Sequence, residues 1–97
     1  MPPAKFRIVY SAAAQADLER LDPGDAVQIV TDAAAHLSDS PLPIGKTRRK
    51  RLSGFAPPLY RLRSGDFRAY YRIFGAEVVI LRVTDRKDAE KLLKRLR

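Results

Sequence analysis

The stretch LYRLRSGDFRAYYRI, residues 59–73, concentrates arginine and tyrosine around a Ser-Gly-Asp turn. Guanidinium groups donate paired hydrogen bonds to a phosphate and stabilise the extra negative charge of a transition state at phosphorus. Arginine stays protonated near neutral pH, so it is a poor proton carrier. A general base and a general acid would have to come from Lys46, Lys50, a tyrosine, the substrate or a larger partner. The stretch is therefore suited to binding an anion.

The charge of the chain is divided unevenly. Residues 1–43 carry three Lys or Arg against six Asp or Glu, whereas residues 44–97 carry sixteen against five, so balances of −3 and +11 make up the net charge of +8. A basic block of this density favours an anionic partner such as nucleic acid, an acidic protein or a membrane surface. A surface that is merely solvated would mix the two signs.

Size and composition exclude several classes of protein. The 97 residues predict one domain, residues 1–97, and the absence of cysteine excludes disulfides and thiolate metal sites. The one histidine, His36, leaves little material for a zinc site. The sequence shows no signal-peptide pattern and no apolar run near the roughly 18 residues of a membrane span. We therefore expect a cytoplasmic protein without metal, cofactor or membrane attachment.

The period of the apolar residues predicts the elements that position the arginines. Strands are predicted at residues 5–11, 59–63, 67–74 and 77–83, and helices at 11–21, 22–38 and 85–96. Short turns at 64–66 and 75–76 make the last three strands an antiparallel meander. Residues 38–54 are expected to form a loop that ends in a run of cations. The predicted fold is α+β, in the order β-α-α-β-β-β-α, with an antiparallel sheet and the helices packed on one face.

Two helices carry an apolar stripe that indicates their buried side. In the second helix the stripe is formed by Val27, Val30, Ala34 and Leu37. This stripe places His36 on the opposite side, where it is a solvated residue rather than a catalytic base. Asp85 can cap the last helix. The stripe of that helix is formed by Ala89, Leu92, Leu93 and Leu96.

Strand parity separates a core face from an outward face in the arginine hairpin. The core face comprises Tyr60, Leu62, Phe67, Ala69, Tyr71 and Ile73. The outward face comprises Arg61, Arg63, Arg68, Tyr70 and Arg72. In the last strand the same reasoning groups Val79, Leu81 and Val83 as the apolar set, with Arg82 following Val78 and Ile80 on the other side.

Like charges on one face cost stability unless an anion relieves them. Alternatively, each arginine lays its stem over exposed sheet and keeps its charged head in water. For Arg63 and Arg72 both interpretations remain open. Arg61, Arg68 and Arg86 together favour an anion site, with Arg86 closing one edge of the cationic surface after the last strand.

The order of these elements, with the motifs LSGF, LYRLRSGDFRAYYRI and VVILRVTDRKDAEK, resembles the RelE/ParE family of bacterial toxins. The resemblance implies a fold like that of microbial ribonucleases and a toxin of a type II toxin–antitoxin pair. A RelE-like member would be a ribosome-dependent messenger RNA endonuclease that inhibits translation. A ParE-like member would poison DNA gyrase. A catalytically weak relative that binds nucleic acid is a third possibility.

In the RelE-like case, the resemblance puts Arg61 at a basic catalytic position, Arg68 at a phosphate-binding position and Arg86 at the arginine after the last strand. The reaction would be attack of the ribose 2′-oxygen on the adjacent phosphate, without metal. The predicted substrate-binding residues are Lys46, Lys50, Arg51, Arg63, Tyr70 and Arg72. Active relatives commonly carry a tyrosine in the terminal segment, where this chain has Glu90 and Leu92. Tyr70 is the predicted substitute for stacking on a base.

The resemblance also implies partners. These are messenger RNA, the ribosome and a RelB-like antitoxin that forms a hetero-oligomer with the toxin. The antitoxin is expected to be acidic or amphipathic, to cover the cationic face and to wrap the helices.

Overall fold

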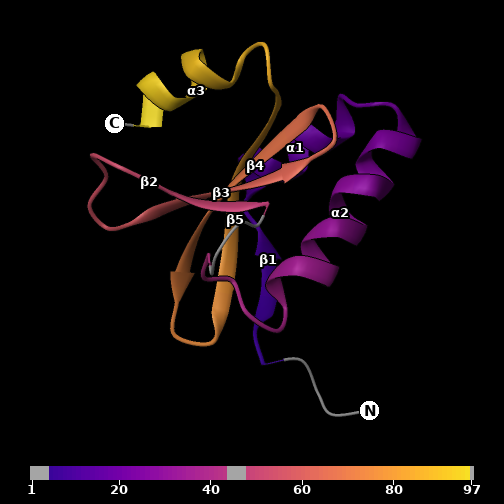
Figure 1. Cartoon of the computed structure of the whole chain (residues 1–97). Helices are drawn as coiled ribbons and strands as arrows, with labels where there is room; N and C mark the ends of the chain where they lie inside the picture. The colour runs from indigo at the N-terminus through magenta and orange to yellow at the C-terminus, as the bar shows by residue number, and fades with distance from the viewer. Residues whose placement is uncertain (1–4, 44–47, 97) are drawn as a thin grey trace.

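The computed structural model describes residues 5–43 and 48–96 (Figure 1). The elements in chain order are β1 (Arg7–Tyr10), α1 (Ala12–Glu19), α2 (Pro23–Leu37), β2 (Arg49–Leu52), β3 (Leu59–Ser64), β4 (Phe67–Phe74), β5 (Glu77–Asp85) and α3 (Ala89–Leu96). The predicted α+β class is confirmed, with one strand more than expected. Across the described residues, no helix has the length and apolar character needed to cross a membrane.

The additional strand is β2, which lies in the segment for which the sequence predicts a loop. Its sequence, RKRL, has no apolar alternation. It forms by antiparallel pairing with β3, in which Lys50 lies opposite Arg61 and Leu52 lies opposite Leu59. β2 is a strand because β3 offers it backbone partners, and local sequence does not reveal that cause.

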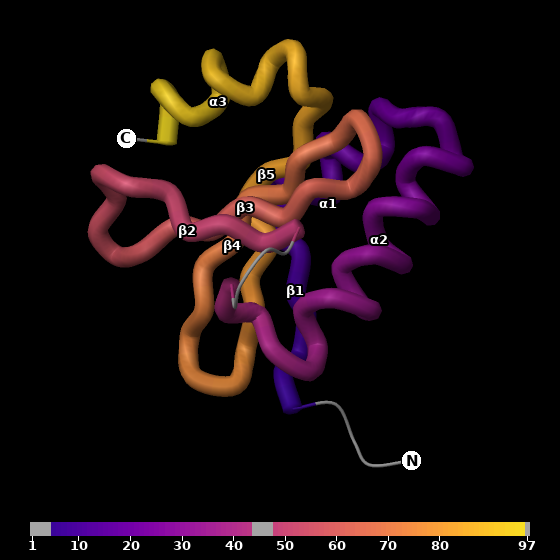
Figure 2. The backbone as a smooth tube through the Cα atoms, in the orientation of Figure 1, coloured from indigo at the N-terminus to yellow at the C-terminus, as the bar shows by residue number. Residues whose placement is uncertain are grey.

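The sheet has five strands in the order β1-β5-β4-β3-β2. The predicted meander of β3, β4 and β5 is confirmed, and its turns use Gly65 and Gly75 at a φ of 57°. β1 instead pairs parallel with β5, with Ile8 opposite Val78, and Figure 2 shows the two strands side by side. The prediction of a wholly antiparallel sheet is therefore wrong at this edge. Parallel strands need a long connection, and here the two paired strands lie near opposite ends of the chain.

The start of α1 is set by Ser11. Its Oγ accepts a hydrogen bond from the Ala14 N–H at 3.0 Å and donates one to the Leu81 carbonyl at 2.8 Å. The first bond satisfies a free N–H of the first helical turn, and the second attaches the end of β1 to β5. The predicted serine cap is thus confirmed.

The buried side of α2 differs from the prediction. Val27 and Val30 are 64% and 42% exposed, and Ala34 is exposed too. The helix packs on the sheet through Ile29, Ala33 and Leu37, so of the predicted stripe only Leu37 is confirmed as buried. Two apolar rows share Leu37 on this helix, and the row that adds the larger Ile29 side chain is buried. With the helix rotated in this way, His36 is half-buried rather than on the solvent side.

The third helix covers the opposite face of the sheet from α1 and α2. Its apolar stripe of Ala89, Leu92, Leu93 and Leu96 is confirmed, and it packs over Leu59 and Tyr70. The prediction that all helices lie on one face is therefore wrong for α3. The physical reason is that the face carrying the arginines also carries Leu59 and Tyr70, whose apolar surface requires a cover.

A β-bulge in β5 changes which side chains of that strand enter the core. Tyr71 lies opposite Ile80, but Tyr70 lies opposite Arg82, so Leu81 is an extra residue between the two pairs. One extra residue reverses the strand parity beyond it. The core side chains are therefore Val78, Ile80 and Val83, and the predicted apolar set is correct only for Val83. In the hairpin, the predicted core positions of Tyr60, Leu62, Ala69 and Tyr71 are confirmed.

Candidate functional site

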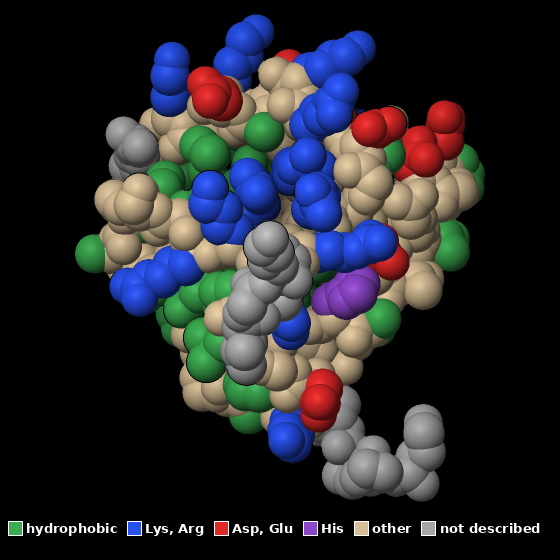
Figure 3. Space-filling model, viewed as in Figure 1, with side chains coloured by type: hydrophobic (Ala, Val, Ile, Leu, Met, Phe, Trp, Pro, Cys, Tyr) green, Lys and Arg blue, Asp and Glu red, His purple; other side chains and the backbone are tan. Residues whose placement is uncertain are grey.

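Cross-strand pairing gathers cations on the face of the sheet opposite α1 and α2. Lys50 lies opposite Arg61, and Arg63 lies opposite Arg68. Directly opposed residues on neighbouring strands project from the same face. We call Lys50, Arg61, Arg63, Arg68 and Arg86 the arginine face. Lys and Arg side chains crowd together on the side of the molecule seen in Figure 3.

Backbone carbonyls at the β3–β4 turn position two of these arginines. The Arg86 N–H donates to the Asp66 carbonyl at 2.9 Å, so the chain leaving β5 is attached to the turn. Nη1 of Arg68 donates to the carbonyls of Gly65 at 3.0 Å and Phe67 at 2.9 Å. The Arg68 guanidinium is therefore held at the turn, where Arg86 is its neighbour.

The charge on this face is mutually repulsive. The pKa of Arg68 is lowered, first by burial and then by the positive charges of Arg61, Arg63 and Arg86, while Tyr70 acts in the opposite direction. A lowered pKa on a guanidinium means that its surroundings resist another positive charge. A bound anion would relieve that repulsion, so the electrostatics of the face favour an anionic ligand.

Two arginines on this side of the sheet each have a buried nitrogen without a hydrogen-bond partner among the described residues. Nε of Arg61 and Nε of Arg72 are buried, and neither makes a hydrogen bond with any described residue. Most buried donors in proteins are paired, so such a nitrogen calls for an explanation. On a cationic face, an acceptor supplied by a ligand such as phosphate would satisfy it.

The family can be assigned from the chain as a whole. Residues 8–90 match the family described as ParE toxin of type II toxin–antitoxin system, parDE. The chain belongs to this toxin family. The resemblance based on the sequence motifs is thereby confirmed.

Individual relatives agree with this assignment. The toxin is 35% identical over 85 residues to Toxin RelG of Mycobacterium tuberculosis, which covers 86% of this chain and 93% of RelG. The RelBE2 toxin–antitoxin complex from the same organism contains a chain that is 36% identical, with a TM-score of 0.65 and coverage of 91% and 97%. The archaeal RelE–RelB complex from Pyrococcus horikoshii OT3 contains one at 24% identity and a TM-score of 0.68, with coverage of 84% and 96%, which shows a shared fold.

Tyr70 of the toxin is not available to a substrate in this structure. It lies on the face that strand parity predicts, but it is fully buried against Leu59 and Leu92. Burial raises the pKa of its phenol, Arg61 and Arg68 oppose the rise, and Glu90 adds to it. While α3 is in place, Tyr70 therefore cannot stack on a base as predicted. Strand parity gave the correct face of the sheet but did not reveal that α3 covers this side chain.

Glu90 lies beside the arginine face, whereas Leu92 does not. The charge of Glu90 acts on the Tyr70 phenol, and its side chain is exposed. Leu92 is buried in the cluster beneath α3. Of the two residues that stand where the resemblance prefers a tyrosine, Glu90 therefore has access to the site, and Leu92 holds the helix on the sheet.

The remaining predicted substrate contacts are divided by the structure. Arg51 lies opposite Tyr60 and so belongs to the other face, where the structure does not bring it together with Lys50. Arg72 lies on the same side as Tyr70, opposite Val79, and away from the row formed by Arg63 and Arg68. Lys46 lies outside the described residues. The structure therefore brings together Lys50, Arg61, Arg63, Arg68 and Arg86.

A polar contact from α2 supports the arginine hairpin. Ser64, the last residue of β3, is fully buried, and its Oγ donates to Asp32 Oδ2 at 2.6 Å. Gln28 Nε2 lies 3.5 Å from the same Oγ. The sequence analysis missed this link, because Asp32 and Gln28 stand in no motif and only the packing of α2 brings them to Ser64.

Replacing Ser64 with alanine is expected to lower the free energy of unfolding by about 1–2 kcal/mol, because Asp32 loses its hydrogen-bond donor in a partly buried setting. Urea denaturation followed by circular dichroism measures this change. The exposed Ser53 provides the control, and its replacement by alanine should have little effect. Equal stability of the two variants would contradict the supporting role.

Proposed function

We propose that this toxin is a messenger RNA endonuclease that acts on the ribosome. The observation that carries the proposal is the convergence of Arg61, Arg63 and Arg86 on Arg68, whose pKa is lowered partly by their charges. A phosphodiester supplies the negative charge that such a site lacks. Single-stranded RNA also presents its 2′-hydroxyl next to each phosphate, so the nucleophile comes with the substrate.

In the proposed reaction, the ribose 2′-oxygen attacks the adjacent phosphorus and the bond to the 5′-oxygen breaks. The products are a 2′,3′-cyclic phosphate and a 5′-hydroxyl. Arg61 and Arg68 bind the phosphate oxygens and stabilise their added charge, and Arg86 closes the edge of the site. Because arginine does not transfer protons, Glu90, the substrate or the ribosome accepts the proton of the 2′-hydroxyl, and Lys50, the substrate or the ribosome donates a proton to the leaving 5′-oxygen.

The proposed cellular partner is a RelB-like antitoxin encoded beside the toxin gene. Solved relatives of this chain are RelE–RelB complexes, one of them at 36% identity. With a net charge of +8, the toxin suits an acidic or amphipathic antitoxin that covers the arginine face, and the two chains form a hetero-oligomer in the cytoplasm.

Mapping of RNA ends after induced expression tests the proposed activity. New 5′-hydroxyl ends should arise within translated codons, and incorporation of labelled amino acids should fall on the same time scale. Intact messenger RNA in cells that have stopped growing would contradict the proposal.

A gyrase poison is the second candidate. It is favoured by the burial of Tyr70 and by the lack of an aromatic residue in α3, since neither Tyr70 nor α3 then offers the arginine face a ring that could stack on a base. This candidate predicts DNA-damage signalling and gyrase-linked DNA breaks while translation is initially intact. The same induced culture distinguishes the two candidates. A weak relative that only binds nucleic acid would be harmless when expressed, and its RNA affinity would fall steeply with salt.

A further inference from the structure

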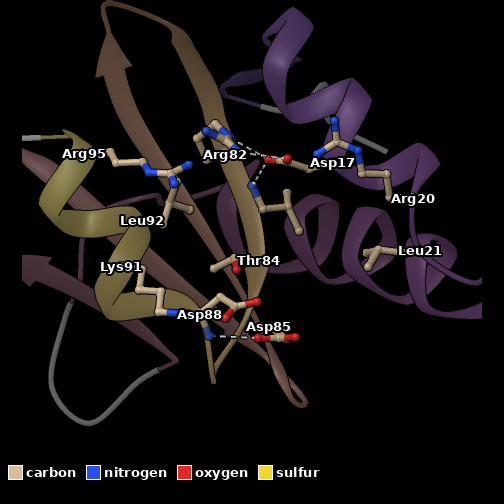
Figure 4. Close-up of a pocket in the computed structure, with 11 residues that line it drawn as sticks. Asp17, Arg20, Leu21, Arg82, Thr84, Asp85, Asp88, Lys91, Leu92 and Arg95 are labelled. Carbon is tan, nitrogen blue, oxygen red and sulfur yellow. Dashed lines mark hydrogen bonds and ion pairs between the residues drawn. The ribbon is translucent and has the colours of Figure 1, made fainter.

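A pocket separate from the arginine face lies where α1, β5 and α3 meet (Figure 4). Its volume is about 370 Å³, and no residue of the arginine face lines it. Asp88, which directly precedes α3, and Lys91, Leu92 and Arg95 of the helix line the pocket, and they follow the i, i+3, i+4, i+7 spacing of one helical face. Glu90 is about 200° around the helix from Asp88 and belongs to the other side. Glu90 and the residues of α3 that line the pocket therefore lie on different flanks of the helix.

At the base of the pocket, the carboxylate of Asp17 is hydrogen-bonded to Arg82 and to the backbone of Val83. Asp17 is 8% exposed, and its carboxylate accepts hydrogen bonds from Nε of Arg82 at 2.8 Å, Nη2 of Arg82 at 3.0 Å and the Val83 N–H at 2.8 Å. The hydrogen bonds to Asp17 are the main cause of the raised pKa of Arg82. These charges already satisfy one another, so the base is a rigid and nearly neutral platform.

Three further cations on the walls are available to a ligand. Arg20 follows α1, and Lys91 and Arg95 belong to α3. All three side chains are exposed, and none forms an ion pair with another described residue. Figure 4 shows Arg20 and Arg95 on opposite sides of the Asp17–Arg82 contact. One end of the pocket is therefore suited to a carboxylate held from both sides.

The opposite end of the pocket is acidic. Asp85 and Asp88 lie together there, since the Asp88 N–H donates to Asp85 Oδ1 at 2.9 Å (Figure 4). Leu21 and Leu92 add apolar surface to the lining. Carboxylates at one end oppose the repeated charges of a nucleic acid, but they leave room for a ligand with a single carboxylate and an adjacent apolar group.

We propose that this pocket binds a short amphipathic segment of the antitoxin. The segment places an Asp or Glu carboxylate between Arg20 and Arg95, and an aliphatic side chain of the segment packs against Leu21 and Leu92. Charge complementarity selects this occupant, because the toxin is strongly basic and the pocket pairs unneutralised cations with apolar surface. The inference rests on the antitoxin partner in the proposed function, and it does not require that the toxin cleave RNA.

Charge reversal on both walls tests the proposal. The probe is the purified antitoxin encoded by the neighbouring gene, and its affinity for the toxin is measured by titration calorimetry. Arg20→Glu and Arg95→Glu should each weaken binding by roughly tenfold, and more strongly at low salt than at high salt. Lys94→Glu is the matched control, because it makes the same charge change on an exposed residue of α3 outside the pocket, and it should weaken binding less.

A reciprocal exchange strengthens the test. The antitoxin Asp or Glu that lies between Arg20 and Arg95 is replaced by arginine. This antitoxin variant should regain affinity for the Arg95→Glu toxin and bind the wild-type toxin more weakly. The inference is overturned if both pocket variants bind the antitoxin no more weakly than Lys94→Glu does. It is also overturned if they lose affinity for a short single-stranded RNA and keep their affinity for the antitoxin. Titration calorimetry measures binding and not catalysis. The result of this test therefore does not depend on whether the toxin cleaves RNA.

Discussion

Arg68→Ala is expected to lower RNA cleavage by roughly 100-fold or more, the effect typical of removing one charge-stabilising donor from a transition state. The reason is that Arg68 lies at the centre of the arginine face, where the charges of Arg61, Arg63 and Arg86 reach it. The measurement is the rate of cleavage of a defined codon on purified ribosomes. Arg68→Lys should recover only part of the rate, because an ammonium group lacks the paired geometry of a guanidinium.

The same variant should keep or increase its stability. Arg68 is repelled by its neighbours, so removal of its charge relieves the folded protein even though two hydrogen bonds to turn carbonyls are lost. Arg7→Ala is the control, since it removes an arginine from β1 whose side chain is 77% exposed, and it should leave cleavage near the wild-type rate. Cleavage by Arg68→Ala at the wild-type rate would contradict the catalytic role, and unfolding of the variant would contradict the expected stability.

The largest loss of stability is expected for Asp17→Ala, at about 3 kcal/mol. This substitution leaves the Arg82 guanidinium and the Val83 N–H without their shared acceptor at the bulge in β5. Urea denaturation of the variant and the wild type measures the difference. No motif marks Asp17 in the sequence, because its partner is 65 residues away along the chain.

Two further variants show whether the Asp17 contact is the cause. Glu19→Ala removes an exposed carboxylate from the same helix and should change stability by less than about 0.5 kcal/mol. Adding Arg82→Met to Asp17→Ala should recover part of the loss, because the unpaired charge is then removed. A loss that is the same for Asp17→Ala and Glu19→Ala would show that the buried contact contributes nothing.

Local patterns in the sequence were sufficient for several features. The period of two in the hairpin separates Tyr71 from Arg68 whatever the rest of the chain does, because side chains alternate along any extended strand. The Ser11 cap and the apolar stripe of α3 depend in the same way on residues within one or two turns of helix. For this reason the grouping of Arg61 with Arg68, and the faces of β3 and β4, could be predicted.

Other features depend on contacts between distant segments. The strand β2 forms because β3 pairs with it, and β1 takes its place through parallel pairing with β5. The bulge at Leu81 reverses the strand parity and brings Val83 into the core. In α2, packing selects one of two apolar rows. None of these outcomes is determined by a short stretch of sequence, since each depends on which of several alternative surfaces the whole chain buries.

Tyr70 combines both kinds of information. Its strand position correctly predicts the face that also carries Arg61 and Arg68. Its burial depends on α3, whose Leu92 packs on it after the chain has crossed β5 and the turn at Arg86. Alternation along a strand specifies a direction, whereas exposure depends on which other element covers that direction. The cationic character of the site was therefore visible in the sequence, while its accessible ligands and the separate pocket beside α3 required the folded chain.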